Sequence, residues 1–304
     1  MHWVYPYEKL RPANVIGTLT ALELASHTKQ KAFVFVSSTS AIDTEHYVRL
    51  SDSLSGEEPD KRGVPESDDL EGARGTLKTG YGQSKWVSEK LLFEAGRRGL
   101  RGNIIRPGYI VGDSTTAVTN TDDFIWRLVK GCIQLGLVPD MNNAINMVPV
   151  DHVARSTALA AFAPASAMPV LHVQATPPPT FNTMLSTLSR YGFGTEPCEY
   201  IVWRRKLEQH VMEAQDNALF PLLHFVLDDL PTSTKAPELN DSNMAALLRA
   251  ADVEPHATVD DALMGKYLAW LIDAEFLPAP KGNAEKALPV LEKGSAKAVG
   301  RSGL

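Results

Sequence analysis

The sequence has few cysteines and no excess of basic residues, and each lack excludes a class of protein. Cys132 and Cys198 are the only cysteines among 304 residues, and two distant thiols make neither a disulfide framework nor a zinc site. Lys and Arg total 30 against 36 Asp and Glu, a net charge of −6. Such a chain does not build the positive field that binds nucleic acid or an anionic membrane. We expect neither partner.

Targeting and metal-binding patterns are also missing. No run of about 18 apolar residues occurs, as a membrane-spanning helix would need, and the first residues lack the basic segment and apolar core of a signal peptide. The eight histidines include no HxxxH or HExxH pair, so we expect no metal site. These absences favour a cytoplasmic protein.

Apolar runs that alternate with helical periodicity predict a layered α/β fold. Residues 32–36 and 103–106 are short apolar runs typical of strands covered on both faces, and residues 13–26 and 81–95 have helical spacing. The order helix, strand, helix, strand implies right-handed crossovers and a parallel, Rossmann-like sheet. The polar segment 50–78 is expected to be a long surface loop.

The pattern changes after residue 176, where the chain becomes mostly helical and is interrupted by prolines. We therefore expect a partial NAD(P)-binding Rossmann domain over residues 1–175, with 114–146 contributing to the substrate side. A smaller, mostly helical substrate-binding subdomain would follow over 176–285. Residues 286–304, small and basic, are expected to form a flexible tail.

A tyrosine and a lysine with helical spacing are the main chemical signal. Tyr81 and Lys85 are four residues apart, so on a helix both side chains lie on one face. A phenol has a pKa of ~10, and a nearby ammonium group lowers that pKa. A tyrosine tuned in this way can give a proton to a carbonyl oxygen as hydride reaches the carbon.

Two strand ends accompany this helix. One strand ends in Ser37-Ser38-Thr39 and another in Arg106-Pro107-Gly108. Ligands of open α/β sheets bind at the carboxyl ends of strands, where a hydroxyl can hold the same carbonyl oxygen. A lone YxxxK also fits an exposed helix face, but its combination with both strand ends favours a catalytic site.

These residues carry a family resemblance. The segments FVFVSSTS, YGQSKW and NIIRPGYIVGD, with VPVDHVAR downstream, resemble the extended short-chain dehydrogenase/reductases. More narrowly, they are similar to thioester reductases of the type found at the C-terminus of fungal L-2-aminoadipate reductase. The similarity is dense from Trp3 to about Phe162 and looser to about residue 280.

The resemblance implies a reaction and its partners. In that family the reductase domain uses NADPH to reduce an acyl thioester, held on a phosphopantetheine arm, to an aldehyde. The implied substrate is L-2-aminoadipate, reduced to its semialdehyde in lysine biosynthesis. The implied partners are an acyl carrier (peptidyl carrier) domain and an adenylation domain in the same full-length chain.

The resemblance also assigns roles by position. Tyr81 would donate the proton, and Lys85 would tune it and bind the nicotinamide ribose. Thr39 matches the catalytic hydroxyl, and Ser38, counted with the cofactor-binding residues, is the second choice. One further segment matches the part of the family that lies against the nicotinamide: Pro107, Gly108, Tyr109 and Ile110. The product of hydride transfer, a thiohemiacetal, would collapse to aldehyde and free thiol.

The family's glycine-rich loop, TGxxGxxG, does not occur in this sequence. That loop cradles the cofactor pyrophosphate at a helix N-terminus. We therefore expect an N-terminally truncated reductase whose sheet lacks its first strands. An exposed apolar sheet edge leads us to expect that the isolated chain folds marginally, binds NADPH poorly and is inactive.

Several alternatives stay open. An NAD-dependent sugar-nucleotide epimerase or dehydratase uses the same Thr-Tyr-Lys set, and a catalytically dead interaction module could keep the site for binding alone. Arg106 fits a position near the site or a buried salt bridge. Three residues, Asp122, Asp123 and Trp126, fit either an acyl pocket or helix capping and packing.

Overall fold

The structure is a computed structural model that describes residues 5–58, 61–163, 167–214, 217–220, 223 and 230–291. Its main sheet has three parallel strands in the order β1 (Phe33–Val36), β2 (Gly102–Pro107) and β6 (Val170–Val173). Every residue of β2 is buried, because β2 has a strand on each side and helices on both faces. The predicted parallel α/β sheet is confirmed.

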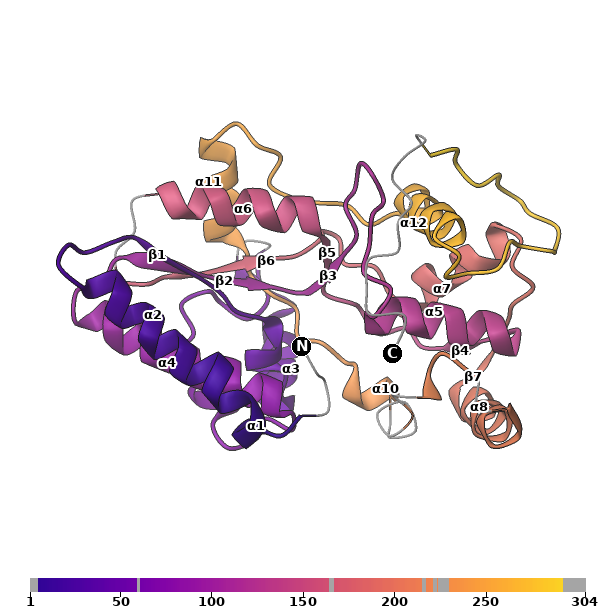
Figure 1. The fold of residues 1–304 in the computed structure, drawn as a ribbon, viewed down its shortest axis with the longest axis horizontal. Helices are drawn as coiled ribbons and strands as arrows, with labels where there is room; N and C mark the ends of the chain where they lie inside the picture. The colour runs from indigo at the N-terminus through magenta and orange to yellow at the C-terminus, as the bar shows by residue number, and fades with distance from the viewer. Residues whose placement is uncertain are drawn as a thin grey trace.

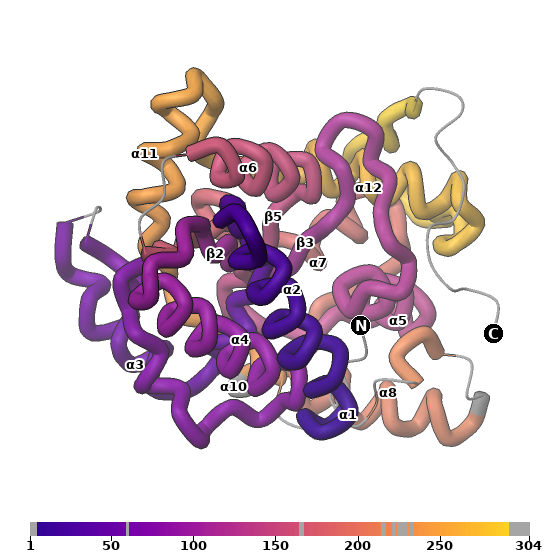
Figure 2. The backbone as a smooth tube through the Cα atoms, turned by 60° about the vertical axis from the view of Figure 1, so that its left-hand side comes forward, coloured from indigo at the N-terminus to yellow at the C-terminus, as the bar shows by residue number. Residues whose placement is uncertain are grey.

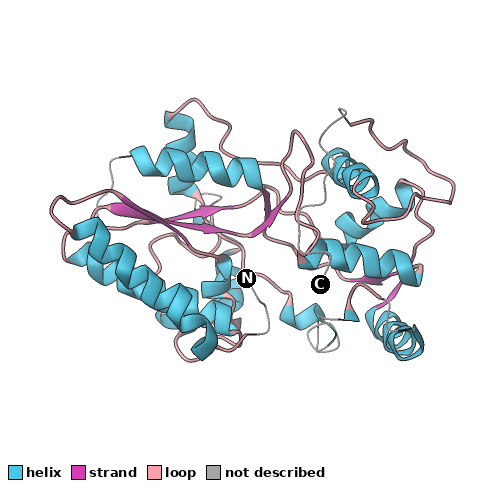
Figure 3. Ribbon diagram, in the orientation of Figure 1, coloured by secondary structure: helices cyan, strands magenta, loops and turns pink. Residues whose placement is uncertain are grey.

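Helices cover both faces of this sheet (Figure 1, Figure 3). One layer contains α1 (Tyr7–Arg11), α2 (Gly17–Ser26), α3 (Glu45–Leu54) and α4 (Gly80–Arg97). The opposite layer contains α6 (Val150–Phe162) and α11 (Ser242–Ala250). Within the first layer, α1 and α2 lie along α4 (Figure 2). Leu92 of α4 is fully buried against Ile104 of β2, which attaches this layer to the sheet.

The remainder of the molecule is mostly helical. It contains α5 (Phe124–Leu135), α7 (Phe181–Arg190), α8 (Tyr200–Ala214), α10 (Leu230–Ser233) and α12 (Asp261–Asp273). Two short parallel pairs join it to the sheet and brace it: β3 (Tyr109–Val111) with β5 (Met147–Pro149), and β4 (Leu137–Asp140) with β7 (Glu196–Glu199). Trp126, Trp203 and Trp270 are fully buried in its core. None of the described helices has the length and apolar character needed to cross a bilayer.

The segment 50–78, expected to be a long surface loop, is exposed over much of its length but is anchored to the sheet, so the prediction holds only in part. Its first residues belong to α3. Glu66, only 6% exposed, accepts backbone N–H bonds from His172 of β6 at 2.8 Å and from Asn243 of α11 at 2.7 Å. Burial raises the pKa of Glu66 to about 7, and these hydrogen bonds oppose the rise. A polar-looking segment thus covers the outer edge of β6.

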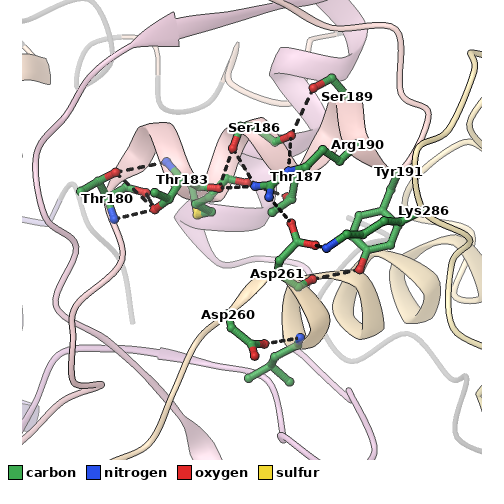
Figure 4. Close-up of polar contacts among 12 residues, drawn as sticks. Thr180, Thr183, Ser186, Thr187, Ser189, Arg190, Tyr191, Asp260, Asp261 and Lys286 are labelled. Atoms are coloured by element: carbon green, nitrogen blue, oxygen red, sulfur yellow. Dashed lines mark hydrogen bonds and ion pairs between the residues drawn. The ribbon is translucent and has the colours of Figure 1, made fainter.

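A cluster of polar side chains holds the segment that follows α12 against the start of that helix (Figure 4). The Asp261 carboxylate, at the start of α12, pairs with Arg190 of α7 at 3.0 Å and with Lys286 at 2.5 Å. The Tyr191 hydroxyl donates to the Asp261 carbonyl oxygen at 3.0 Å. Lys286, at the start of the expected tail, is therefore held against α12, and residues 292–304 of that tail lie outside the described residues.

Candidate active site

Helix α4 places Tyr81 and Lys85 in its first turns, at the carboxyl end of β1. The helix starts at Gly80 because the Thr79 hydroxyl accepts the backbone N–H of Gly82 at 3.1 Å. A Cβ at Gly82 would lie 2.6 Å from the carbonyl oxygen of Ser40, so only glycine allows the helix to approach the segment after β1 this closely. The close approach brings the hydroxyl-rich strand end to Tyr81.

The hydroxyl that reaches Tyr81 belongs to Ser38. Ser38 has an extended backbone and caps a short 3-10 helix, Thr39–Ile42, by accepting the N–H of Ser40 at 3.1 Å. Its side chain hydrogen-bonds Tyr81, and this bond lowers the pKa of the phenol. Burial raises that pKa by more, so the pKa of Tyr81 is raised overall. Thr39, the first choice from the resemblance, begins the 3-10 helix itself.

Lys85 lies beside Tyr81 as the helical spacing predicts. Its Nζ is 5.8 Å from the centre of the Tyr81 ring and 4.7 Å from that of Phe35. The ammonium donates to the carbonyl oxygen of Val36, the last residue of β1, at 2.7 Å. Burial lowers the pKa of Lys85, and the nearby Glu89 carboxylate opposes that change.

The expectation that Lys85 lowers the pKa of Tyr81 is wrong for this structure. Burial of the phenol disfavours its charged form and dominates the shift. The Lys85 ammonium donates a hydrogen bond to the carbonyl oxygen of Val36 at the end of β1 and not to the phenol oxygen. Tyr81 is therefore protonated at neutral pH, the state that a proton donor needs.

The bend after β2 requires a glycine at position 108. A Cβ there would lie 1.8 Å from the carbonyl oxygen of Asn146. The Gly108 N–H donates to the carbonyl oxygen of Val173 at 3.1 Å, and the Tyr109 N–H donates to the carbonyl oxygen of Asn146 at 2.6 Å. The chain thus leaves the main sheet at Pro107 and enters β3, and Ile110 of β3 stays partly exposed.

Burial and the carboxyl groups of Asp43 and Asp123 raise the pKa of Tyr109, and no sequence pattern pointed to Asp43. Asp43 directly follows the 3-10 helix after Ser38 and stays in contact with solvent. The surrounding protein nevertheless raises the pKa of Asp43 to about 6, and burial also raises the pKa of Asp123 to about 6. Burial, followed by the charges of Asp43 and Asp123, raises the pKa of Tyr109.

The structure decides between the alternatives around α5. Asp123 caps the helix by accepting the backbone N–H of Ile125 at 2.9 Å. Trp126 is fully buried, and its indole N–H donates to the Thr119 hydroxyl at 2.6 Å. Capping and packing, rather than an acyl pocket, explain the conformations of these two side chains.

A buried ion pair between β2 and α4 lies next to the candidate site. Arg106 and Glu89 are both 0% exposed, and Arg106 donates to the two Glu89 carboxylate oxygens at 2.5 and 3.2 Å. The Ser37 hydroxyl also donates to Glu89. Of the two alternatives for Arg106, the structure shows the buried salt bridge.

His172 completes this network. Its Nδ1–H donates to the carbonyl oxygen of Asn240 at 2.6 Å, so Nε2 is the acceptor for Arg106 at 2.8 Å. Burial, followed by the Arg106 charge, lowers the pKa of His172 to about 3. The ring is therefore neutral, which lets it accept a hydrogen bond from the guanidinium.

This arrangement of sheet, tyrosine and lysine agrees with the comparisons to known proteins. Residues 1–157 match the NAD-binding family described as "Male sterility protein". The chain belongs to this family. This match confirms the prediction of a nicotinamide-binding fold of the short-chain dehydrogenase/reductase type.

The curated relatives narrow the similarity. The chain is 52% identical over 293 residues to L-2-aminoadipate reductase of Schizosaccharomyces pombe, covering 94% of this chain and 20% of the relative. It is 46% identical over 301 residues to L-2-aminoadipate reductase of Saccharomyces cerevisiae, covering 96% and 22%. The chain therefore spans about a fifth of the length of these relatives.

A solved structure supports the same assignment. The terminal R domain from the myxalamid PKS-NRPS biosynthetic pathway superposes with a TM-score of 0.79 at 30% identity, covering 92% of this chain and 68% of that one. The resemblance to reductase domains inferred from the sequence motifs is confirmed, and so is the fold class.

Proposed function

We propose that this chain carries out NADPH-dependent reduction of a carrier-bound acyl thioester to an aldehyde, with L-2-aminoadipate as the acyl group. The observation that carries the proposal is the meeting of Tyr81, Ser38 and Lys85 at the carboxyl end of β1. The names of the curated relatives support the substrate.

The residues at this end of the sheet suit a nicotinamide cofactor. Gly108 lets the backbone turn without a side chain, and Pro107 to Ile110 would lie along the nicotinamide ring. The Lys85 ammonium, now on the Val36 carbonyl, would bind the ribose hydroxyls. When bound, the cofactor supplies the hydride.

The chain's own groups would manage the proton. Tyr81 would donate its phenolic hydrogen to the thioester oxygen as negative charge develops there. The Ser38 hydroxyl, already bonded to the phenol, would hold that oxygen and the phenol in line. The protonated product is a thiohemiacetal, and breaking its C–S bond releases the aldehyde and the carrier thiol.

The substrate would arrive on a phosphopantetheine arm. We assign the delivery to a peptidyl carrier domain loaded by an adenylation domain, and the great length of the curated relatives supports such partners. The proposed setting is lysine biosynthesis in the cytoplasm, where the two free thiols would stay reduced.

A chimera tests the proposal. The matching segment of the S. pombe L-2-aminoadipate reductase is replaced by this chain, and NADPH oxidation is measured with L-2-aminoadipate and ATP. We expect NADPH consumption with aldehyde formation. A nucleotide-sugar substrate in place of aminoadipate is the control, and turnover of that sugar alone would favour an epimerase or dehydratase. NADPH binding without reduction of any thioester would favour an interaction module.

The two candidate hydroxyls can be separated in the same chimera. Ser38→Ala removes the group bonded to Tyr81, so we expect kcat to fall by about 10²-fold, the scale for one lost oxyanion donor. Thr39→Val is the matched control and should have a clearly smaller effect. A larger loss with Thr39→Val would return the catalytic hydroxyl to Thr39.

A further inference from the structure

The carboxamide of Gln174 is buried at the end of β6, and only its nitrogen is hydrogen-bonded. Gln174 directly follows the last residue of β6 and is 7% exposed. Its Nε2 donates to the carbonyl oxygen of Leu239 at 3.0 Å. Its Oε1 accepts no hydrogen bond within the part of the chain that the structure describes. Buried polar groups are nearly always satisfied, so this oxygen indicates a ligand that donates a hydrogen bond.

The Gln174 side chain lies on the face of the sheet that α4 covers. His172, two residues earlier, bonds Arg106, which pairs with α4, and the carbonyl oxygen of Asn240. Residues i and i+2 of a strand share a face. The Gln174 amide accordingly bonds the neighbouring carbonyl, that of Leu239. Gln174 and the helix that carries the candidate active site are therefore on one side of the sheet.

The same side chain is close to the segment that follows β1. Leu239 packs in one apolar cluster with Ile42, which ends the 3-10 helix that starts after Ser38. The segment around Leu239 covers the Gln174 amide, so a ligand reaches Oε1 only as that segment shifts outward. Such a ligand would lie across the carboxyl ends of the strands, where open α/β sheets bind substrates.

The spacing of the strands fits the length of L-2-aminoadipate. Two steps of ~4.8 Å between neighbouring strands place the ends of β1 and β6 about 10 Å apart. With the thioester at C6, four carbon–carbon bonds of ~1.5 Å and one bond to nitrogen separate the reacting carbon from the amine, a span of about 6 Å when extended. A hydrogen bond to the amine adds ~2.9 Å. A substrate that reacts beside Tyr81 therefore reaches the end of β6 with its amine.

The charge at this end of the sheet favours a cationic donor. The carboxyl groups of Asp43 and Asp123 both act on Tyr109, and the pKa of each carboxyl is about 6, so both are mostly ionised above neutral pH. Tyr109 is one residue after Gly108, whose N–H bonds the last residue of β6. An ammonium group is favoured here over a neutral donor.

We propose that Gln174 Oε1 accepts a hydrogen bond from the 2-ammonium group of the aminoadipyl substrate and so distinguishes it from an acyl group without that amine. The inference rests on the proposed reductase function and adds a specificity-determining residue to it. The Gln174 nitrogen stays bonded to Leu239, which fixes the direction of the amide oxygen.

Two small thioesters test this proposal in the chimera with the S. pombe enzyme. The N-acetylcysteamine thioesters of L-2-aminoadipate and of adipate differ only in the amine, and neither needs ATP or a carrier. NADPH oxidation gives kcat and KM for each. We expect the wild-type chimera to prefer the aminoadipyl thioester by about ten- to a hundredfold in kcat/KM, the scale for a hydrogen bond to a charged group.

A variant at position 174 should remove this preference. Gln174→Met keeps a side chain of similar length without the amide oxygen. We expect KM for the aminoadipyl thioester to rise about tenfold or more with little change in kcat, the pattern for lost substrate binding. The kinetic constants for the adipyl thioester should stay near those of the wild type.

Asn146→Leu is the matched control. Asn146 is 4% exposed, and its Nδ2 donates to the carbonyl oxygen of Pro237 at 3.0 Å, so this variant loosens the same segment without removing Gln174. Its effect on the two thioesters should be equal, and the preference for the amine should remain.

The outcomes separate this inference from the reductase proposal. Equal losses with both thioesters in Gln174→Met, or equal kcat/KM values for both in the wild-type chimera, overturn the role of Gln174 and leave the reductase proposal standing. Failure of the wild-type chimera to reduce either thioester overturns the reductase proposal and this inference with it.

Discussion

Tyr81→Phe in the chimera is expected to lower aldehyde formation by ~10²–10⁴-fold, the usual range for a lost general acid. The phenyl ring keeps the packing of a side chain that is 7% exposed and removes only the hydroxyl. The hydroxyl is the group hydrogen-bonded to Ser38, and its raised pKa keeps the proton available at neutral pH. Loss of the phenol leaves the developing oxyanion with the Ser38 hydroxyl but without a proton donor.

The measurement separates chemistry from binding. NADPH oxidation is followed under saturating substrate, and NADPH affinity by fluorescence titration. We expect affinity to change little, because the ring and Lys85 remain in place. Tyr7→Phe, the same change on α1 outside the site, is the control. Retention of more than a tenth of the activity by the Tyr81 variant would contradict the proton-donor role.

Glu89→Gln has the largest expected effect on stability. Glu89 and Arg106 are both 0% exposed, and the substitution leaves the guanidinium charge buried without a carboxylate. Breaking a buried pair in this way costs about 3–5 kcal/mol. The Ser37 hydroxyl also loses an ionised acceptor, so the end of β1 should loosen together with β2.

Urea unfolding followed by circular dichroism measures this loss. Glu94→Gln is the matched control on the same helix, since Glu94 pairs with Arg97 and Arg98 at the surface. Exposed pairs contribute little, so the control should unfold close to the wild type. Equal midpoints for the two variants would show that the buried pair does not stabilise the sheet.

The strands and the tyrosine–lysine spacing could be predicted because both depend on short-range patterns. An apolar run with β-branched and aromatic residues predicts a strand from only five residues. The run 32–36 contains β1, as predicted. Tyr81 and Lys85 share a helix face by the geometry of four residues. Any helix over this segment places the two side chains together, whatever surrounds it.

Which hydroxyl meets Tyr81 could not be predicted, because four hydroxyl residues, 37–40, follow one another and the backbone decides between them. The chain is extended at Ser38 and turns into a 3-10 helix at Thr39, so only the fold determines the direction of each side chain. The pKa of Tyr81 also depended on the fold. Its direction follows from burial, which requires knowledge of everything packed around the ring.

By itself, the sequence determined the parallel α/β architecture, the family and the pairing of Tyr81 with Lys85, since these follow from local periodicity and contiguous motifs. Only the tertiary structure decided the partners of Arg106 and Glu66. Glu89 is 17 residues before Arg106, and Glu66 binds backbone groups 106 and 177 residues away. No pattern along the chain specifies such pairings, because they depend on which elements the packed sheet brings into contact.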